Sequence, residues 1–281
     1  MEMPISANAR PRVSCTDCVL REMCLPAGLS RSEFQSAEQL VSTRLRVRRG
    51  AALYRRGDAF KSFYVVWLGS LKSTVTSEDA REQVTGFHMA GDMLGFDGVG
   101  SGSHDCDAVA LEDSEVCVFP YSRIEELANT LPALRKHLFR LMSREIVRKH
   151  GLMLMLGSMH ADERLAGFLL DLADRFESRG YSSTRFVLRM TRAEIGSLLG
   201  ITLETVSRVM SQFAKDGLID LQSVKHVRIA DQDRLRRLAI GREAARPAAA
   251  PGRAREAQRR SAVRAPAPRA ARPEVQEALV V

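Results

Sequence analysis

The segment 190–210 restricts the fold of this 281-residue chain more than any other part of it. Thr191 and Glu194 have the spacing of a capping box, in which both side chains accept hydrogen bonds from backbone N–H groups at the start of a helix. Gly200 then provides a tight turn, and Thr202 can cap a second helix. The apolar residues of the two predicted helices would pack together: Ile195, Leu198, Leu199, Ile201, Val206 and Val209. This pattern predicts a helix-turn-helix unit.

The second of these helices carries a polar outer face near its start, formed by Glu204, Thr205, Ser207 and Arg208. Side chains of this kind form hydrogen bonds to base edges when such a helix enters the major groove of DNA. An ordinary helical hairpin with a solvated polar face is the less favoured interpretation. Downstream, residues 217–221 and 226–229 predict a β-hairpin wing, and residues 231–238 predict a short capped helix.

Short apolar or alternating runs separated by glycines extend from about Ser30 to Tyr121. Strands of this length with turn residues between them are typical of a sandwich or barrel, so we expect a β-roll-like domain. The clearest strands are 63–67, 72–75, 84–88 and 116–119, and the second and third of these predict a hairpin. An amphipathic helix is expected from Ala161 to Arg179.

A long helix is predicted from about Leu134 to Met159. Its apolar residues recur at alternating steps of three and four, with Lys149 in the single gap: Phe139, Met142, Ile146, Met153 and Leu156. This heptad pattern predicts that two chains pair along the helix as a homodimer. A helix packed on its own domain is the alternative.

Residues 241–281 contain nine Arg, four Glu and no Lys, and they are rich in Ala and Pro. This composition cannot bury a core, so we expect a disordered, solubilising tail, with non-specific DNA tethering as the alternative.

The whole pattern predicts an α+β fold in five parts. They are a cysteine loop (1–29), a β-roll sensor domain (30–133), a dimerisation helix (134–160), a winged helix-turn-helix domain (161–240) and the tail (241–281).

The five cysteines indicate metal binding. The chain begins without the apolar core of a signal peptide and has no run of about 18 apolar residues, so we expect a cytoplasmic protein with no membrane span. In that reducing compartment, clustered thiols hold metals more often than they form disulfides. Cys15, Cys18 and Cys24 lie within one loop, and a fourth ligand must come from Cys106 or Cys117. Spacing leaves zinc and an iron–sulfur cluster equally open, and it does not choose between the two distant cysteines.

Four features together resemble the fumarate-and-nitrate-reduction (FNR) regulators of the cyclic-AMP receptor protein superfamily. They are the Cys-x2-Cys-x5-Cys run, the stretch TGFHMAGDMLGFD at 85–97, the heptad helix, and the Glu-x-x-Ser-Arg run at 204–208. The likeness extends from about Cys15 to Leu238. The last run is specific to the FNR branch, whereas the β-roll glycines are common to the superfamily.

The resemblance implies an oxygen-labile [4Fe–4S] cluster held by Cys15, Cys18, Cys24 and Cys117. It selects Cys117 because the fourth ligand of the family lies just before a proline that ends a strand, as Pro120 follows here. Cys106 becomes an extra thiol. The resemblance further implies a regulator that dimerises without oxygen, binds a TTGAT-N4-ATCAA-like palindrome and activates transcription with RNA polymerase.

One departure from the superfamily excludes cyclic nucleotides as the expected ligand. Members that bind cyclic AMP carry a Glu and a later Arg in the phosphate cassette, whereas this chain reads Gly95-Phe-Asp97 and later Ser103-His-Asp-Cys106. No Arg is present there to meet a cyclic phosphate. The main alternative is a regulator with a structural zinc, a constitutive dimer and an unknown small-molecule effector in the β-roll. An enzyme has little support, because no nucleophile–base pair or phosphate loop stands out.

Lys149 leads to a hypothesis about the oxygen switch. In a parallel pair of helices the two Lys149 side chains would meet in a partly desolvated place, where like charges oppose association. We expect this repulsion to keep the cluster-free protein monomeric, with cluster binding overcoming it. The alternative is that Lys149 reaches solvent along its aliphatic stem and has little effect.

Overall fold

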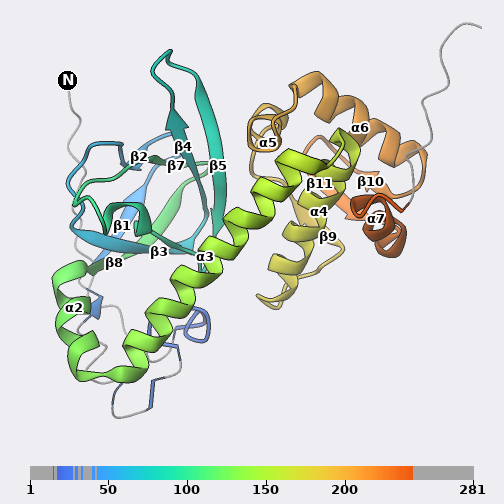
Figure 1. The fold of residues 1–281 in the computed structure, drawn as a ribbon. Helices are drawn as coiled ribbons and strands as arrows, with labels where there is room; N and C mark the ends of the chain where they lie inside the picture. The colour runs from blue at the N-terminus through green and yellow to red at the C-terminus, as the bar shows by residue number, and fades with distance from the viewer. Residues whose placement is uncertain are drawn as a thin grey trace, which may run out of the picture. The chain divides into compact units, whose positions relative to one another are not determined.

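The structure is a computed structural model that describes residues 15, 18–27, 29–30, 33, 40–41 and 43–242. Almost all of the tail predicted at 241–281 lies outside the described residues. Figure 1 shows a β-rich part, a long helix and a helix-rich C-terminal part. Within the described ranges, no helix combines the length and the apolar composition needed to cross a bilayer.

Two four-stranded antiparallel sheets form the β-rich part (Figure 1). One sheet has the order β1-β8-β3-β6, with strands Thr43–Val47, Ser114–Pro120, Ser62–Leu68 and Met93–Leu94. The other has the order β2-β7-β4-β5, with strands Ala52–Tyr54, Asp107–Ala110, Ser70–Thr76 and Glu82–Met89. The predicted hairpin is present as β4 and β5. The predicted β-roll and the α+β class are confirmed.

Strands β3 and β8 separate two hydrophobic cores, because successive side chains of a strand point to opposite faces of the sheet. Val66 and Val116 face the core between the two sheets. Val65 and Cys117 face a second core, which also contains Leu25 of the N-terminal loop. Cys117 therefore lies on the face of the sheet that packs against the cysteine loop.

Three helices follow the sheets: α2 (Tyr121–Thr130), α3 (Pro132–Ser158) and α4 (Ala161–Glu177). The sequence did not predict α2, a ten-residue helix that buries Ile124. Helix α3 begins before the predicted start because Pro132 occupies its first turn, where the N–H that proline lacks would have no intrahelical partner.

The predicted helix-turn-helix unit is formed by α5 (Arg192–Leu199) and α6 (Leu203–Lys215). Both sides of the capping box at Thr191 and Glu194 are present. The Thr202 hydroxyl accepts a hydrogen bond from the Thr205 backbone N–H at 3.2 Å. Gly200 ends α5 with a φ of 62°, a left-handed conformation that costs glycine little. These local signals position the start of α6.

A three-stranded sheet and a last helix complete the C-terminal part. Strands β10 (Ile219–Leu221) and β11 (His226–Ile229) form the predicted wing, and Asp231 caps the predicted helix α7 (Gln232–Ala239). The sheet has the order β10-β11-β9. Its edge strand β9 (Arg185–Val187) was not predicted from the sequence.

A buried ion cluster joins the loop after β5 to α4. The two carboxylate oxygens of Asp92 lie 2.5 Å from Nη2 of Arg175 and 2.6 Å from Nη2 of Arg179. Val84 and Phe87 of β5 belong to the same hydrophobic core as the buried faces of α4, α5 and α6. The β-roll and the helix-turn-helix unit therefore share one core.

Candidate metal centre and nucleic-acid interface

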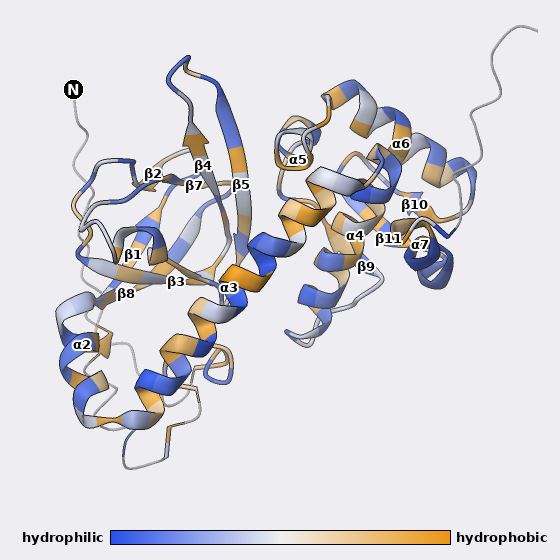
Figure 2. Cartoon of the chain, viewed as in Figure 1, coloured by the Kyte–Doolittle hydropathy of each residue, from blue (hydrophilic) through white to orange (hydrophobic). Residues whose placement is uncertain are grey.

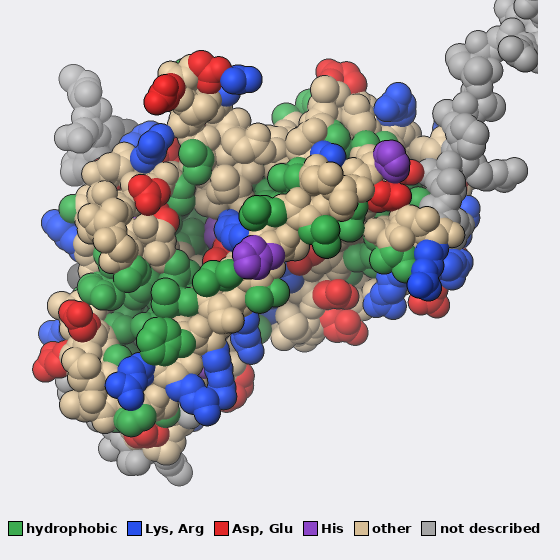
Figure 3. All heavy atoms as spheres, in the orientation of Figure 1, with side chains coloured by type: hydrophobic (Ala, Val, Ile, Leu, Met, Phe, Trp, Pro, Cys, Tyr) green, Lys and Arg blue, Asp and Glu red, His purple; other side chains and the backbone are tan. Residues whose placement is uncertain are grey.

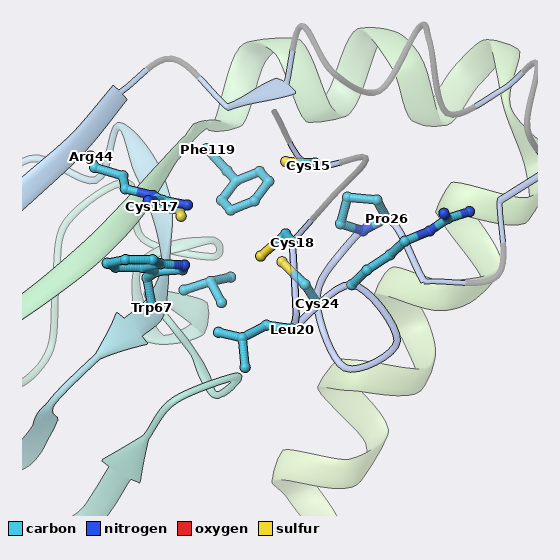
Figure 4. A pocket seen from close by; sticks show the side chains of 11 residues that line it. Cys15, Cys18, Leu20, Cys24, Pro26, Arg44, Trp67, Cys117 and Phe119 are labelled. Atoms are coloured by element: carbon cyan, nitrogen blue, oxygen red, sulfur yellow. The ribbon is translucent and has the colours of Figure 1, made fainter. Parts of the chain in front are cut away.

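One small pocket brings together four of the five cysteines (Figure 4). Cys15, Cys18 and Cys24 come from the N-terminal loop, and Cys117 comes from β8. Figure 4 shows the four side chains around a common space. The other lining residues are Leu20, Arg21, Pro26, Arg44, Val65, Trp67 and Phe119. The predicted cysteine set is thus assembled from two distant parts of the chain.

Backbone hydrogen bonds fold the described part of the cysteine loop into a run of turns. The N–H of Cys24 donates to the Leu20 carbonyl at 2.9 Å, and the N–H of Ala27 donates to the Cys24 carbonyl at 2.9 Å. Leu25 is fully buried in the core that also contains Leu134 of α3. The loop that carries three of the thiols therefore packs against the beginning of α3 as well as against the sheet.

Burial favours the neutral form of the Cys24 and Cys117 thiols. Burial is the largest cause that raises the pKa of Cys24 well above its usual value, and the nearby Cys117 and Cys15 raise it further. Burial also raises the pKa of Cys117, while Arg44 opposes that shift. Thiolates this close to one another repel, so they ionise together when a metal cation compensates their charge.

The donor set suits a metal centre, although the loop must move to hold one. Four thiols are the donor set of both structural zinc sites and iron–sulfur clusters. The enclosed space is about 10 Å³, enough for about one water molecule. Among the described residues, no three His, Cys, Asp or Glu side chains already surround one ion position. Metal binding therefore requires the turn-rich loop to rearrange around the incoming group.

Cys106 lies away from this pocket. Its thiol donates to Oδ2 of Asp97 at 3.4 Å, and its side chain packs on the core between the two sheets. Burial, with a further contribution from Asp97, raises the pKa of Cys106 to about 12. The backbone N–H of Asp105 also donates to Asp97, at 3.0 Å. The Asp97 carboxylate therefore accepts hydrogen bonds from both Asp105 and Cys106.

Two pocket residues were not identified from the sequence. Arg44 on β1 is directly opposite Cys117 on β8, and its guanidinium carbon lies 3.8 Å from the centre of the Trp67 ring. Their place in the pocket depends on strand pairing, which no local motif reveals. The one signal in the sequence was that Trp67 is the only tryptophan of the chain.

The polar face of α6 lies where the sequence predicted it. Glu204 and Arg208 are exposed, and Thr205 and Ser207 are half-buried. Hydrogen bonds from the backbone of Glu204 and from the Thr202 hydroxyl lower the pKa of Glu204. Glu204 is therefore an ionised hydrogen-bond acceptor at neutral pH, on the first turn of the helix.

Helix α3 exposes a band of large apolar side chains, visible as green atoms along the helix in Figure 3 and as orange segments in Figure 2. Its exposed members are Phe139, Ile146, Val147, Met153 and Leu154, each more than half exposed. Met142 and Leu156 are half-buried. The heptad pattern did not single out Val147 and Leu154, which widen the band.

The Lys149 amine is bound within its own chain. Its Nζ donates to the Thr85 carbonyl on β5 at 2.8 Å and lies 3.3 Å from Oε1 of Glu145. The side chain remains 40% exposed. A partner chain facing Lys149 stays a prediction.

Comparisons with known proteins agree with both halves of the fold. Residues 44–130 match a cyclic nucleotide-binding domain, and residues 163–238 match a Crp-like helix-turn-helix domain. The transcriptional regulatory protein btr of Bordetella pertussis is 44% identical over 241 residues, which cover 86% of this chain and 98% of that protein. The fumarate and nitrate reduction regulatory protein of Escherichia coli is 39% identical over 227 residues, which cover 81% and 90%. The solved structure of FixK2 from Bradyrhizobium japonicum is 30% identical with a TM-score of 0.66, and the match covers 71% of this chain and 98% of that one.

The fold and the helix-turn-helix unit, together with these relatives, define a transcription regulator with a β-roll and a winged helix-turn-helix domain. The chain belongs to the Crp/FNR family, as its resemblance to the FNR regulators predicted. Both of these named relatives are regulatory proteins.

Proposed function

We propose that this protein is an oxygen-responsive transcription activator that binds a [4Fe–4S] cluster through Cys15, Cys18, Cys24 and Cys117. The supporting observation is that one pocket is lined by all four of these side chains. The similarity to a fumarate and nitrate reduction regulatory protein points the same way. When bound, the cluster supplies an oxygen-labile metal–sulfur link between the cysteine loop and β8.

The described contacts explain how that link can affect α3. Leu25 and Leu29, which follow the third cysteine, share a core with Leu134 and the partly buried Leu138 of α3. His137 is also a buried residue of α3. A loop fixed against β8 therefore holds the beginning of α3, and an already ordered helix loses less freedom when two chains associate.

Pairing along the exposed apolar band of α3 would give a dimer with two α6 helices. Such helices read half-sites one DNA turn apart. The resemblance to the FNR regulators supplies the proposed operator, a TTGAT-N4-ATCAA-like palindrome. On each α6, Glu204 accepts from cytosine N4, Arg208 donates to guanine or a phosphate, and Ser207 contacts a thymine or its neighbour. RNA polymerase is the proposed further partner, and the cytoplasm is the proposed location.

The β-roll is proposed to take no cyclic nucleotide. Asp97, from the short 3-10 helix Phe96–Gly98, places its carboxylate next to the backbone N–H of Asp105 and the ring of His104. The His104 ring is itself stacked on Tyr54 with centroids 3.7 Å apart. A cyclic phosphate brought here would meet a carboxylate, and like charges repel.

Metal analysis of the protein purified without oxygen tests the proposal. We expect a brown protein with iron and acid-labile sulfide in equal amounts, whose visible absorption is lost in air. A colourless protein that contains zinc would overturn the cluster and favour a structural zinc site with constitutive dimers.

A further inference from the structure

The four thiols do not account for the whole pocket, because a half-buried cation, Arg44, also lines it. Arg44 and Cys117 are direct cross-strand neighbours on β1 and β8, so both side chains lie on the same face of the sheet. The guanidinium group lies flat over Trp67, with its central carbon 3.8 Å from the ring centre (Figure 4).

One donor of this cation has no acceptor. The Nε of Arg44 is buried and has no hydrogen-bond partner within the described part of the chain. Among the described residues that line the pocket there is no Asp or Glu. A buried charged donor without a partner is costly, so such a group is typically kept for a ligand that supplies the missing acceptor.

The chemistry of the missing acceptor follows from the pocket. Arg44 points its donors toward the space shared by the thiols, and metal-bound thiolates and sulfides are anionic acceptors. Guanidinium groups form strong, charge-assisted hydrogen bonds to anions, and an aromatic face beneath the plane holds them in position. Hydrogen bonds to cluster sulfurs and the local charge are among the factors that set the reduction potential of a cluster.

We propose that Arg44, held by Trp67, is a positioning residue that donates hydrogen bonds to the sulfur atoms of the metal centre at Cys117. Arg44 stabilises the bound centre by offsetting its negative charge. This inference rests on the proposed function, since it needs a metal–sulfur group in the pocket. It adds a fifth residue to the site, which acts on the centre without being a ligand.

The test uses the full-length protein, purified and reconstituted with iron and sulfide without oxygen, as wild type, Arg44→Gln and Arg44→Lys. The first readout is the rate at which iron passes to a chelator in the absence of oxygen. The second is the midpoint potential of the cluster, measured by redox titration. Arg46→Gln is the matched control, because Arg46 is on the same strand but pairs with Glu115 on the surface with 63% of its side chain exposed.

We expect Arg44→Gln to lose iron about 10-fold to 100-fold faster, as is typical when residues that support metal ligands are lost. Its midpoint potential should become more negative, because the positive charge that stabilises the reduced cluster has been removed. Arg44→Lys keeps the charge, so its iron-loss rate and midpoint potential should lie between those of Arg44→Gln and the wild type. Arg46→Gln should match the wild type in both. A purely structural role for Arg44 would leave the potential unchanged.

The outcomes separate this inference from the proposed function. If the wild type takes up no iron and sulfide, the proposed function is wrong and the inference falls with it. If the wild type is loaded and the Arg44→Gln cluster has the wild-type potential and iron-loss rate, only the inference is overturned. If Arg44→Gln does not fold, as judged by circular dichroism, Arg44→Lys decides alone. A wild-type potential and iron-loss rate in that variant would overturn the inference.

Discussion

At the scale of single residues, the pocket joins three cysteines of one loop to Cys117 on β8 and to Arg44 on the neighbouring β1. Three cysteines in one loop are visible in the sequence, and so are the caps at Thr191 and Thr202, because each depends on residues a few positions apart. The side of the sheet on which Cys117 lies depends on the pleat of β8. The position of Arg44 depends on the register of β1 against β8. Neither long-range pairing leaves a trace in local sequence.

Cysteine substitutions test the ligand set. Replacing Cys15, Cys18, Cys24 or Cys117 by Ser should reduce the iron content after anaerobic reconstitution to near zero, because each change leaves an iron without its thiolate. Cys106→Ser is the control and should keep its iron, since Cys106 donates to Asp97 outside the pocket. Iron that survives in Cys117→Ser and disappears in Cys106→Ser would show that the fourth ligand is assigned incorrectly.

Glu204 provides the residue-scale test of DNA reading. Glu204→Ala should relax selectivity at one base pair about 10-fold or more, because the carboxylate that accepts from cytosine N4 is gone. The measurement is binding to a set of operators that differ at single positions. Glu125→Ala, an exposed change on α2, should leave the selectivity profile as it is. A uniform loss across all operators would argue against base reading by Glu204.

At the scale of elements, the long helix α3 and the helix-turn-helix unit were predicted, whereas α2 and β9 were not. The heptad positions of α3 span many turns, so their pattern stands out. Strand β9 has three residues, and its place in the sheet depends on pairing with β11, which lies about 40 residues further along the chain. The exposed apolar band of α3 agrees with the predicted pairing surface, while the Lys149 amine is tied to Thr85 on its own β5.

Substitutions of Lys149 test whether its charge prevents the α3 helices of two chains from pairing in air. The cluster-free Lys149→Leu and Lys149→Ala variants should sediment as dimers and bind the operator, because a charge beside the apolar band is removed. Arg144→Ala is a suitable control, since Arg144 is exposed on the same helix. Lys149 variants that remain monomeric without the cluster would refute the repulsion hypothesis.

At the scale of the whole molecule, the ion cluster of Asp92 connects the β-roll to α4. Burial alone would raise the pKa of Asp92, but Arg175, Arg148 and Arg179 outweigh it and hold the pKa at about 2. Asp92 is thus ionised in the folded protein at every pH above this value. These partners are far apart in sequence, so the connection could not be predicted from it.

Asp92→Asn should destabilise the protein by about 3–5 kcal/mol, because buried arginines lose their counter-charge. Urea unfolding measures this, and Asp79→Asn in an exposed hairpin loop should have little effect. The folded pKa is depressed, so the stabilisation by Asp92 is complete above the usual pKa of 3.8 and declines as the pH falls toward about 2. If Asp92→Asn unfolds at the wild-type urea concentration, the ion cluster does not stabilise the fold.

One measurement tests the proposed oxygen switch most directly. A single anaerobic sample is followed by visible absorption, sedimentation and binding to the TTGAT-N4-ATCAA-like operator, before and after exposure to air. We predict a brown dimer that binds the operator, and a colourless monomer that does not bind it once the visible absorption is lost. Dimers that keep the same affinity for the operator after the iron is lost would contradict the switch.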